Sequence, residues 1–232
     1  MDYNFLLYLL LVGFVAAMVS YPLTNFVGLM ARSLGFVDKP DGHHKNHGRE
    51  VALGGGLAVF LSATVTFGVE FLSSSPLQSV LQDKAPYLTG LLLACAWIVS
   101  VGLYDDRFGM RGIWKMAGQV IAALIVIQSG LVIEKFAVFG QVISLGYLAK
   151  PFTAFWLVGA MNSLNLLDGI DGLATTIGVI LCATITVMAV VFNQGAVAVV
   201  GAVFSGSLLG FLRFNFPPAT IFLGDAGSML IV

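Results

Sequence analysis

The chain of 232 residues is 58% hydrophobic and only 10% charged, with a mean hydropathy of +0.95 and a formal net charge of −1. Soluble domains carry about 25% charged residues, so this composition excludes an ordinary water-soluble fold. It also lacks the basic footprint of a nucleic-acid-binding protein, and no nucleic-acid partner is expected. The two cysteines, Cys95 and Cys182, lie inside apolar runs and provide neither a disulfide framework nor zinc-finger spacing.

Apolar runs long enough to cross a lipid bilayer recur along the chain, since about 18 residues suffice for a transmembrane helix. We expect spans near 4–24, 52–72, 87–104, 116–133, 152–167, 173–192 and 196–212, and the start of an eighth near 227. A membrane β-barrel would show alternation over ~10-residue segments instead. The sequence therefore predicts an all-α, polytopic transmembrane helical bundle, with residues 1–232 forming a single membrane-embedded domain of about seven complete spans.

The loops between these spans, assigned alternately to the two sides of the membrane, carry unequal positive charge. Eight of the 11 Lys and Arg residues fall on the side that receives 25–51, 105–115, 168–172 and 213–226. Cytoplasmic loops carry the excess of Lys and Arg, so we expect this side to be cytoplasmic and the N-terminus to be external.

Four dense polar clusters fall on this same side, at 38–50, 104–115, 162–172 and 222–228. Clusters from four loops on one face predict one shared site. A transporter of a phosphorylated solute is the alternative of another class, but it would more often place ionisable groups near the midplane of several spans.

Carboxylates dominate the predicted site: Asp105, Asp106, Asp168, Asp171 and Asp225. Converging acids without cations would repel one another, and a hard divalent cation would relieve that repulsion. Mg²⁺ takes oxygen ligands and is commonly held by one or two carboxylates together with substrate phosphates, so the cluster suits a Mg²⁺–diphosphate site. The alternative is that Asp168 and Asp171, each followed by Gly, are helix caps or turn residues.

The asparagines Asn162 and Asn165 are three residues apart and share a helix face, which Asp168 continues. Gly169 and Gly172 allow a turn and the close approach of a ligand. The alternative for the asparagines is interhelical hydrogen bonding. Downstream, Asp225 stands between small residues, and Phe222 could stack on a flat ring or simply pack.

A histidine-rich stretch, "HHKNH" at 43–47, raises the question of zinc. His43, His44 and His47 lack a clear further ligand, and Lys45 would oppose a cation. Contacts with phosphate are the favoured role of this stretch.

Together the four clusters resemble the polyprenyl-phosphate N-acetylhexosamine-1-phosphate transferases, over roughly 35–228. The motif N-x-x-N-x-x-D-G-x-D-G-L is complete at 162–173 and is paired with an upstream D-D and a downstream G-D-x-G-S. The resemblance implies transfer of a sugar-1-phosphate from a UDP-N-acetylhexosamine to a polyprenyl phosphate in the lipid bilayer, with release of UMP. It also implies Mg²⁺ as cofactor, with Mn²⁺ as a substitute, and suggests a homodimer.

The run "DDRF" is similar to the N-acetylglucosamine-1-phosphate branch of this family. The peptidoglycan branch usually has D-D-Y-x-K, and Thr before D-G-x-D-G, where this chain has Arg107 and Leu167. The resemblance therefore implies UDP-N-acetylglucosamine as donor and undecaprenyl phosphate as acceptor, in a bacterial inner membrane, at the start of cell-envelope polysaccharide synthesis. A phospho-MurNAc-pentapeptide-type or other N-acetylhexosamine transferase, and an inactive fragment, remain alternatives.

Roles carry over from the family only where residues match its motifs. Asp225 resembles the Mg²⁺ ligand, which Asn165 joins. Asp105 and Asp106 match the catalytic pair near the lipid phosphate, and we favour Asp105 as the base. The remaining matches are expected to contact substrate: Lys45, His47, Lys115, Asn162, Asp168, Asp171 and Phe222.

Two departures from the family pattern stand out in the first loop, where His44 replaces the usual Arg and Ala52 a common Pro. Family members are also longer and carry a further His/Arg-rich cytoplasmic loop. We therefore expect that the chain, which stops at Val232, is truncated at its C-terminal end relative to the family.

Overall fold

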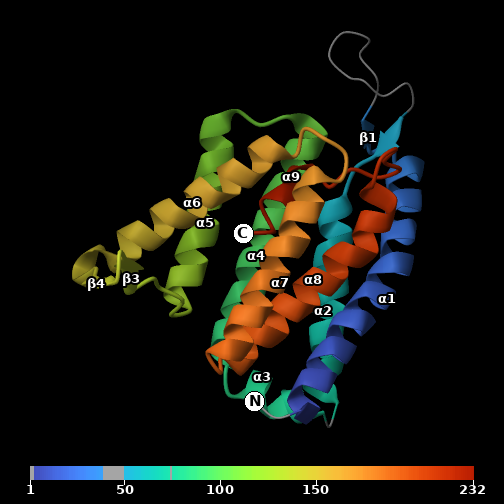
Figure 1. Cartoon of the computed structure of the whole chain (residues 1–232). Coiled ribbons are helices and arrows are strands. Elements are labelled where there is room, and N and C mark those ends of the chain that lie inside the picture. The colour runs from blue at the N-terminus through green and yellow to red at the C-terminus, as the bar shows by residue number, and fades with distance from the viewer. Residues whose placement is uncertain (1–2, 39–49, 74) are drawn as a thin grey trace.

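The computed structural model describes residues 3–38, 50–73 and 75–232, and it is a bundle of long helices (Figure 1). The helices are α1 (Tyr3–Ser33), α2 (Gly55–Leu72), α3 (Pro76–Gln82), α4 (Ala85–Phe108), α5 (Gly112–Gln128), α6 (Ala149–Leu167), α7 (Leu173–Val191), α8 (Gly195–Asn215) and α9 (Gly224–Ser228), with a 3₁₀ turn at Gly146–Leu148. The prediction of an all-α polytopic membrane protein is confirmed.

Among the described residues, five helices are long and apolar enough to cross a membrane: α1, α2, α4, α7 and α8. The 17-residue α5 is shorter, and α6 is not among the five, so the expected count of about seven spans is not confirmed. The run near 227, expected to begin an eighth span, starts at the end of the five-residue helix α9 (Gly224–Ser228).

Small residues bring α1, α2 and α8 into close contact. A Cβ added at Gly206 of α8 would collide with the carbonyl oxygen of Gly13 in α1. Nearby hydroxyls are satisfied across the same interface, because Ser20 Oγ donates to the Ser207 carbonyl at 2.6 Å and Ser62 Oγ donates to the Ala16 carbonyl at 3.1 Å. Close backbone approach and internal hydrogen bonds are the expected basis of helix packing in lipid.

The short helix α9 fits into a slot between α2 and α4. A Cβ at Gly56 of α2 would meet the backbone of Ala226 and Gly227, and a Cβ at Gly102 of α4 would lie 2.8 Å from the carbonyl carbon of Asp225. These two glycines therefore bring Asp225 against α4, and they do so because only hydrogen fits at either position.

Two antiparallel hairpins join the helices. Strand β1 (Val37–Asp38) pairs with β2 (Val51–Ala52), and a parallel bridge joins Ala52 to Ile221. Strand β3 (Lys135–Val138) pairs with β4 (Gln141–Ser144) between α5 and α6. Figure 1 shows α5 and α6 leaning away from the helices α1, α2, α7 and α8.

Candidate active site

A cavity of about 670 Å³ opens at the end of the bundle where α4 and α6 finish and α9 begins. Six predicted site residues line it: Asp106, Asn165, Asp168, Asp171, Phe222 and Asp225. The clusters at 104–115, 162–172 and 222–228 thus converge, as their common placement on one side of the membrane predicts. Lys45 and His47, with the rest of the histidine-rich stretch, lie outside the described residues.

Asp106 fastens α9 to the end of α4. Its Oδ1 accepts the backbone N–H of Asp225 at 2.8 Å, and its Oδ2 accepts that of Ala226 at 3.4 Å. Gly224 has φ +72°, and a Cβ there would lie 2.6 Å from Asp106 Oδ2. A glycine is therefore required where the chain turns onto this carboxylate. Asp106 therefore positions Asp225 through the backbone of α9.

Lys115 of α5 lies among acidic groups from other helices. Its Nζ is 3.1 Å from Asp105 Oδ2, 2.8 Å from Asp225 Oδ2 and 3.2 Å from Asn165 Oδ1. Asp105 also accepts the Met110 N–H at 2.6 Å, and its side chain is only 9% exposed. Asp105 therefore faces Lys115 and is not among the residues that line the cavity.

The two asparagines of α6 point in the same general direction but have different partners. Asn165 Nδ2 donates to Asp225 Oδ1 and, at 2.9 Å, to Ser228 Oγ. Asn162 Nδ2 donates to Gln119 Oε1 at 2.8 Å, one turn deeper, and does not line the cavity. For Asn162 the structure therefore favours the alternative role, an interhelical hydrogen bond.

Gln119 of α5 is a buried partner of Asn162 that the sequence did not predict. It is fully buried, and besides Asn162 it contacts Met229, whose Sδ lies 3.3 Å from its Nε2. Its signal in the sequence was a single amide inside an apolar run, four residues after Lys115 and hence on the same helix face.

The two acids of the D-G-x-D-G element have different surroundings. Burial raises the pKa of Asp168 to about 7, with help from the Asp106 and Asp225 carboxylates, while a hydrogen bond from the Gly224 N–H opposes the rise. Asp171 Oδ2 instead accepts the Ala219 N–H at 3.0 Å and ties two loops together. This contact is of the kind expected of a turn residue, the alternative that the sequence offered, and Asp171 lines the cavity as well.

The loop that carries Phe222 is fixed from both sides. The Phe222 N–H donates to the Ala52 carbonyl at 2.8 Å, and its own carbonyl accepts the Gly55 N–H at 3.0 Å. Buried Asn215, also missed from the sequence, accepts the Thr175 hydroxyl at 2.6 Å and donates to the Ile221 carbonyl at 3.1 Å. These contacts hold Phe222 at the wall of the cavity.

The donor set at the cavity suits a hard cation. No group of three His, Cys, Asp or Glu side chains is arranged to hold a metal within the described ranges. Carboxylate and amide oxygens of Asp225, Asn165, Asp106 and Asp168 nevertheless share the cavity wall. The raised pKa of Asp168 reflects in part the negative charge of its neighbours, which a cation would relieve. Mg²⁺ is commonly held by a few protein oxygens, with water molecules and substrate phosphates as its other ligands.

Taken together, the helices and the acidic cavity define a multi-pass helical membrane protein with a polar site at one end. The profile of glycosyl transferase family 4 matches residues 88–232. The chain belongs to this family, which confirms the resemblance inferred from its motifs.

Similar proteins carry names from two branches of the family. The chain is 32% identical to a probable undecaprenyl-phosphate N-acetylglucosaminyl 1-phosphate transferase of Bacillus subtilis, over 96% of this chain and 60% of the relative. It is 35% identical to a decaprenyl-phosphate N-acetylglucosaminephosphotransferase of Mycobacterium tuberculosis, over 96% and 57%. It is 34% identical to a phospho-N-acetylmuramoyl-pentapeptide-transferase of Thermoanaerobacter, over 95% and 70%. The chain spans about 60% of the length of the first of these relatives.

Proposed function

We propose that the chain forms the membrane core of a transferase that moves a sugar-1-phosphate from a UDP-sugar to undecaprenyl phosphate and releases UMP. The observation that carries the proposal is the mutual contact of Asp105, Asp225, Asn165 and Lys115 from four helices, beside a polar cavity that Asp225 and Asn165 line. The relatives named above act, by their names, on polyprenyl phosphates with amino-sugar phosphates.

The reaction is a phosphoryl transfer in which positioning and electrostatics supply most of the rate. An oxygen of the lipid phosphate forms a bond to the β-phosphorus of the UDP-sugar. The bond from that phosphorus to the bridging oxygen breaks, and its electron pair leaves with UMP. Asp105 accepts any proton that remains on the attacking phosphate. Lys115 gives up its contact with one of its two carboxylate partners and binds the phosphate in its place, which orients the phosphate.

Asp225 and Asn165 would hold Mg²⁺, for which Mn²⁺ could substitute, and when bound the ion would offset charge on the diphosphate. Asp106 keeps Asp225 in place through the α9 backbone. Asp168, Asp171 and Phe222 form the uridine side of the cavity, where Lys45 and His47 from the first loop would add positive charge.

We further infer that the donor is UDP-N-acetylglucosamine, on the evidence of Arg107 and Leu167, with the phospho-MurNAc-pentapeptide branch as the second candidate. The positive-inside bias supports a cavity on the cytoplasmic side and an external N-terminus. The bacterial origin of the relatives named above supports a bacterial inner membrane. Initiation of a cell-envelope polysaccharide would follow from this donor and acceptor. A homodimer remains a proposal from the family alone.

Release of UMP by detergent-solubilised protein tests the proposal. With UDP-N-acetylglucosamine, undecaprenyl phosphate and Mg²⁺, we expect release that requires all three and falls by about 10³-fold in Asp225→Ala, as for other charge-stabilising groups. Glu134→Ala, an exposed acid outside the cavity, is the matched control and should retain full activity. Release that needs no lipid, or that survives in Asp225→Ala, would refute the assignment.

A parallel binding measurement distinguishes an inactive core from a different function. If UDP-N-acetylglucosamine binds in the presence of Mg²⁺ without turnover, and the binding is lost in Asp225→Ala, the chain is a substrate-binding core that lacks turnover. If another nucleotide sugar binds instead, the donor assignment is wrong. A transporter would carry ionisable groups at mid-span, whereas the acids that line this cavity lie at helix ends.

A further inference from the structure

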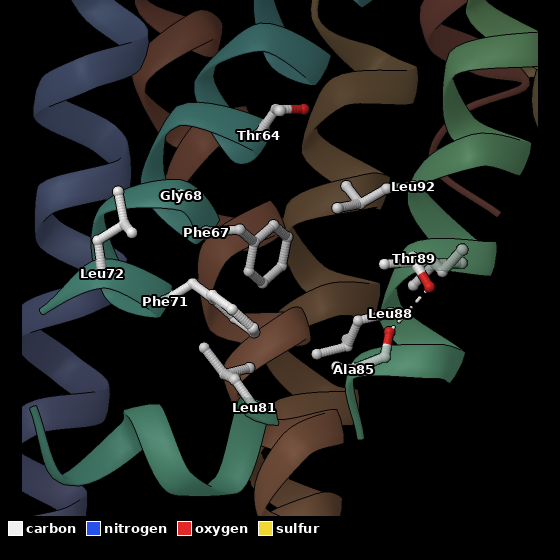
Figure 2. Close-up of a pocket in the computed structure, with 11 residues that line it drawn as sticks. Thr64, Phe67, Gly68, Phe71, Leu72, Leu81, Ala85, Leu88, Thr89 and Leu92 are labelled. Atoms are coloured by element: carbon white, nitrogen blue, oxygen red, sulfur yellow. Dashed lines mark hydrogen bonds between the residues drawn. The ribbon is translucent and has the colours of Figure 1, made fainter. Parts of the chain in front are cut away.

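Two cavities flank the beginning of α4, at the end of the bundle far from the acidic site. One, of about 330 Å³, lies between α2, α3 and α4. Figure 2 shows Phe67 and Phe71 of α2 facing Leu88 and Leu92 of α4, with Leu81 of α3 at one edge. The other, of about 710 Å³, lies between α1, the α3–α4 corner and the α7–α8 turn. Leu88 and Leu91 line both cavities and form the wall between them.

The smaller cavity offers no polar handle to a ligand. Its two hydroxyls are already satisfied, because Thr64 Oγ1 donates to the Phe60 carbonyl at 2.8 Å and Thr89 Oγ1 donates to the Ala85 carbonyl at 2.9 Å. A cavity with no unsatisfied polar group in its lining favours an apolar occupant over water. Since α2 and α4 are both apolar enough to span a membrane, the available occupant is a hydrocarbon chain.

The rim of the larger cavity carries one charge of each sign. Asp83 and Lys84 are adjacent at the α3–α4 corner, and both line this cavity. Lys84 Nζ lies 5.6 Å from the centre of the Tyr87 ring. Within the described part of the chain, neither Asp83 nor Lys84 has an ion-pair partner. Both charges are therefore available to a ligand. A neighbouring anion and cation are the complement of a zwitterion whose own charges are a few bonds apart.

We propose that the α3–α4 corner binds one molecule of a two-chain zwitterionic phospholipid with a primary ammonium headgroup, phosphatidylethanolamine. One hydrocarbon chain fills each cavity, on either side of the wall formed by Leu88 and Leu91. Lys84 contacts the phosphate and Asp83 accepts hydrogen bonds from the ammonium group. The site is separate from the transferase site, and its occupancy can be measured whether or not the chain turns over substrate.

The chemistry of the corner separates this lipid from two others. Phosphatidylcholine has the same charges but no N–H donors for the Asp83 carboxylate. Phosphatidylglycerol has the phosphate but no cation. Its binding would therefore leave the Asp83 carboxylate without a partner and would place the negative phosphate close to it. The order of binding should therefore be phosphatidylethanolamine first, with the other two clearly weaker.

Native mass spectrometry of the full chain, released from detergent after incubation with equal amounts of the three lipids, tests the proposal. We expect one retained phosphatidylethanolamine per chain. Lys84→Gln should lower its retention by about fivefold, the effect of one exposed charge contact. Gly68→Leu should lower it by about tenfold, because Gly68 lines the smaller cavity and a Cβ there meets no atom within 4 Å, so the added side chain fills the space.

Matched controls separate binding from general damage. Lys135→Gln removes an exposed lysine from β3, and Gly159→Leu enlarges a helical glycine of α6 that also has open space around it. Both should retain the lipid as the unmodified chain does. Equal retention in Gly68→Leu and Gly159→Leu, or stronger retention of phosphatidylglycerol or of phosphatidylcholine, would overturn the proposal.

Discussion

Helices α8 and α6 are of similar length but are held in place in different ways. Twelve of the 21 residues of α8 are buried, against four of the 19 in α6. Helix α8 packs through small residues against α1, whereas α6 reaches α5 and α9 through Asn162 and Asn165. The polar side chains of α6 therefore carry structure as well as chemistry, while α8 packs against α1 away from the site and reaches the site through Asn215 at its end.

The largest effect expected from this comparison is at Gly206. Replacing Gly206 by Val should destabilise the protein by about 3 kcal/mol or more, because the side chain collides with the α1 backbone, which cannot move aside easily. Thermal unfolding followed by circular dichroism measures the loss. Gly159→Val on α6 is the control and should cost less than ~1 kcal/mol for helix propensity. Equal losses would mean that the two helices are packed alike.

Lys115→Met should have the next largest effect. It leaves Asp105 and Asp225 without their shared cation, and we expect a loss of ~2 kcal/mol, reduced from the value for a fully buried pair because the Asp225 side chain is 29% exposed. Added Mg²⁺ should restore part of this stability in the variant, as shown by its unfolding temperature. An unfolding temperature in the variant that does not respond to Mg²⁺ would argue against a cation site at these acids.

A double-mutant cycle on Gln119 and Asn162 isolates the deeper contact of α6. Gln119→Leu alone should cost about 0.5–1.5 kcal/mol, since it removes the hydrogen bond that the buried Gln119 amide accepts from the more exposed Asn162. Gln119→Leu combined with Asn162→Leu should cost less than the sum of the two single changes, by ~1 kcal/mol. Denaturant unfolding measures all four proteins. Strict additivity would show that the two side chains do not interact.

The smallest effect is expected at Gly68, which belongs to neither kind of region. Its Cβ position is open and its backbone is helical, so Gly68→Ala should stabilise the chain by about 0.5–1 kcal/mol through helix propensity alone. Thermal unfolding should show a small rise in midpoint. A fall would indicate that α2 is strained or contacted at this position.

Hydropathy predicted the long helices well but not the pieces between them. The apolar runs anticipated α1, α2, α4, α7 and α8, although α1 continues through Pro22 to Ser33, well past the expected end at 24. Helix α3 was missed because PLQSVLQ is short and half polar, and hairpin β3–β4 because its strands are largely exposed. Such segments are fixed by neighbours rather than by periodicity.

The proximity of Asp105, Asp225 and Asn165 was predictable from the sequence, because the segments that carry them fall on one side of the membrane. The site was not predictable where the role of a residue depends on a distant partner. The residues around Gln119 do not indicate that it contacts Asn162, and those around Asn215 do not indicate that it holds the loop at 216–223. Each contact joins segments whose proximity depends on the folded chain. The division of labour between Asp105, which faces Lys115, and Asp106, which binds the α9 backbone, likewise appears only in three dimensions.

The slot for α9 also has a consequence for biosynthesis. Gly56 and Gly102 are made long before residues 224–228, so α2 and α4 are synthesised before the helix that packs against both glycines and donates to the Asp106 carboxylate. Chains fold from the N-terminus as they are made. The polar end of the bundle is therefore completed late. A nascent chain that ends before Gly224 would carry Asp105 and Asp106 of α4 without α9, which supplies Asp225 and the backbone donors to Asp106.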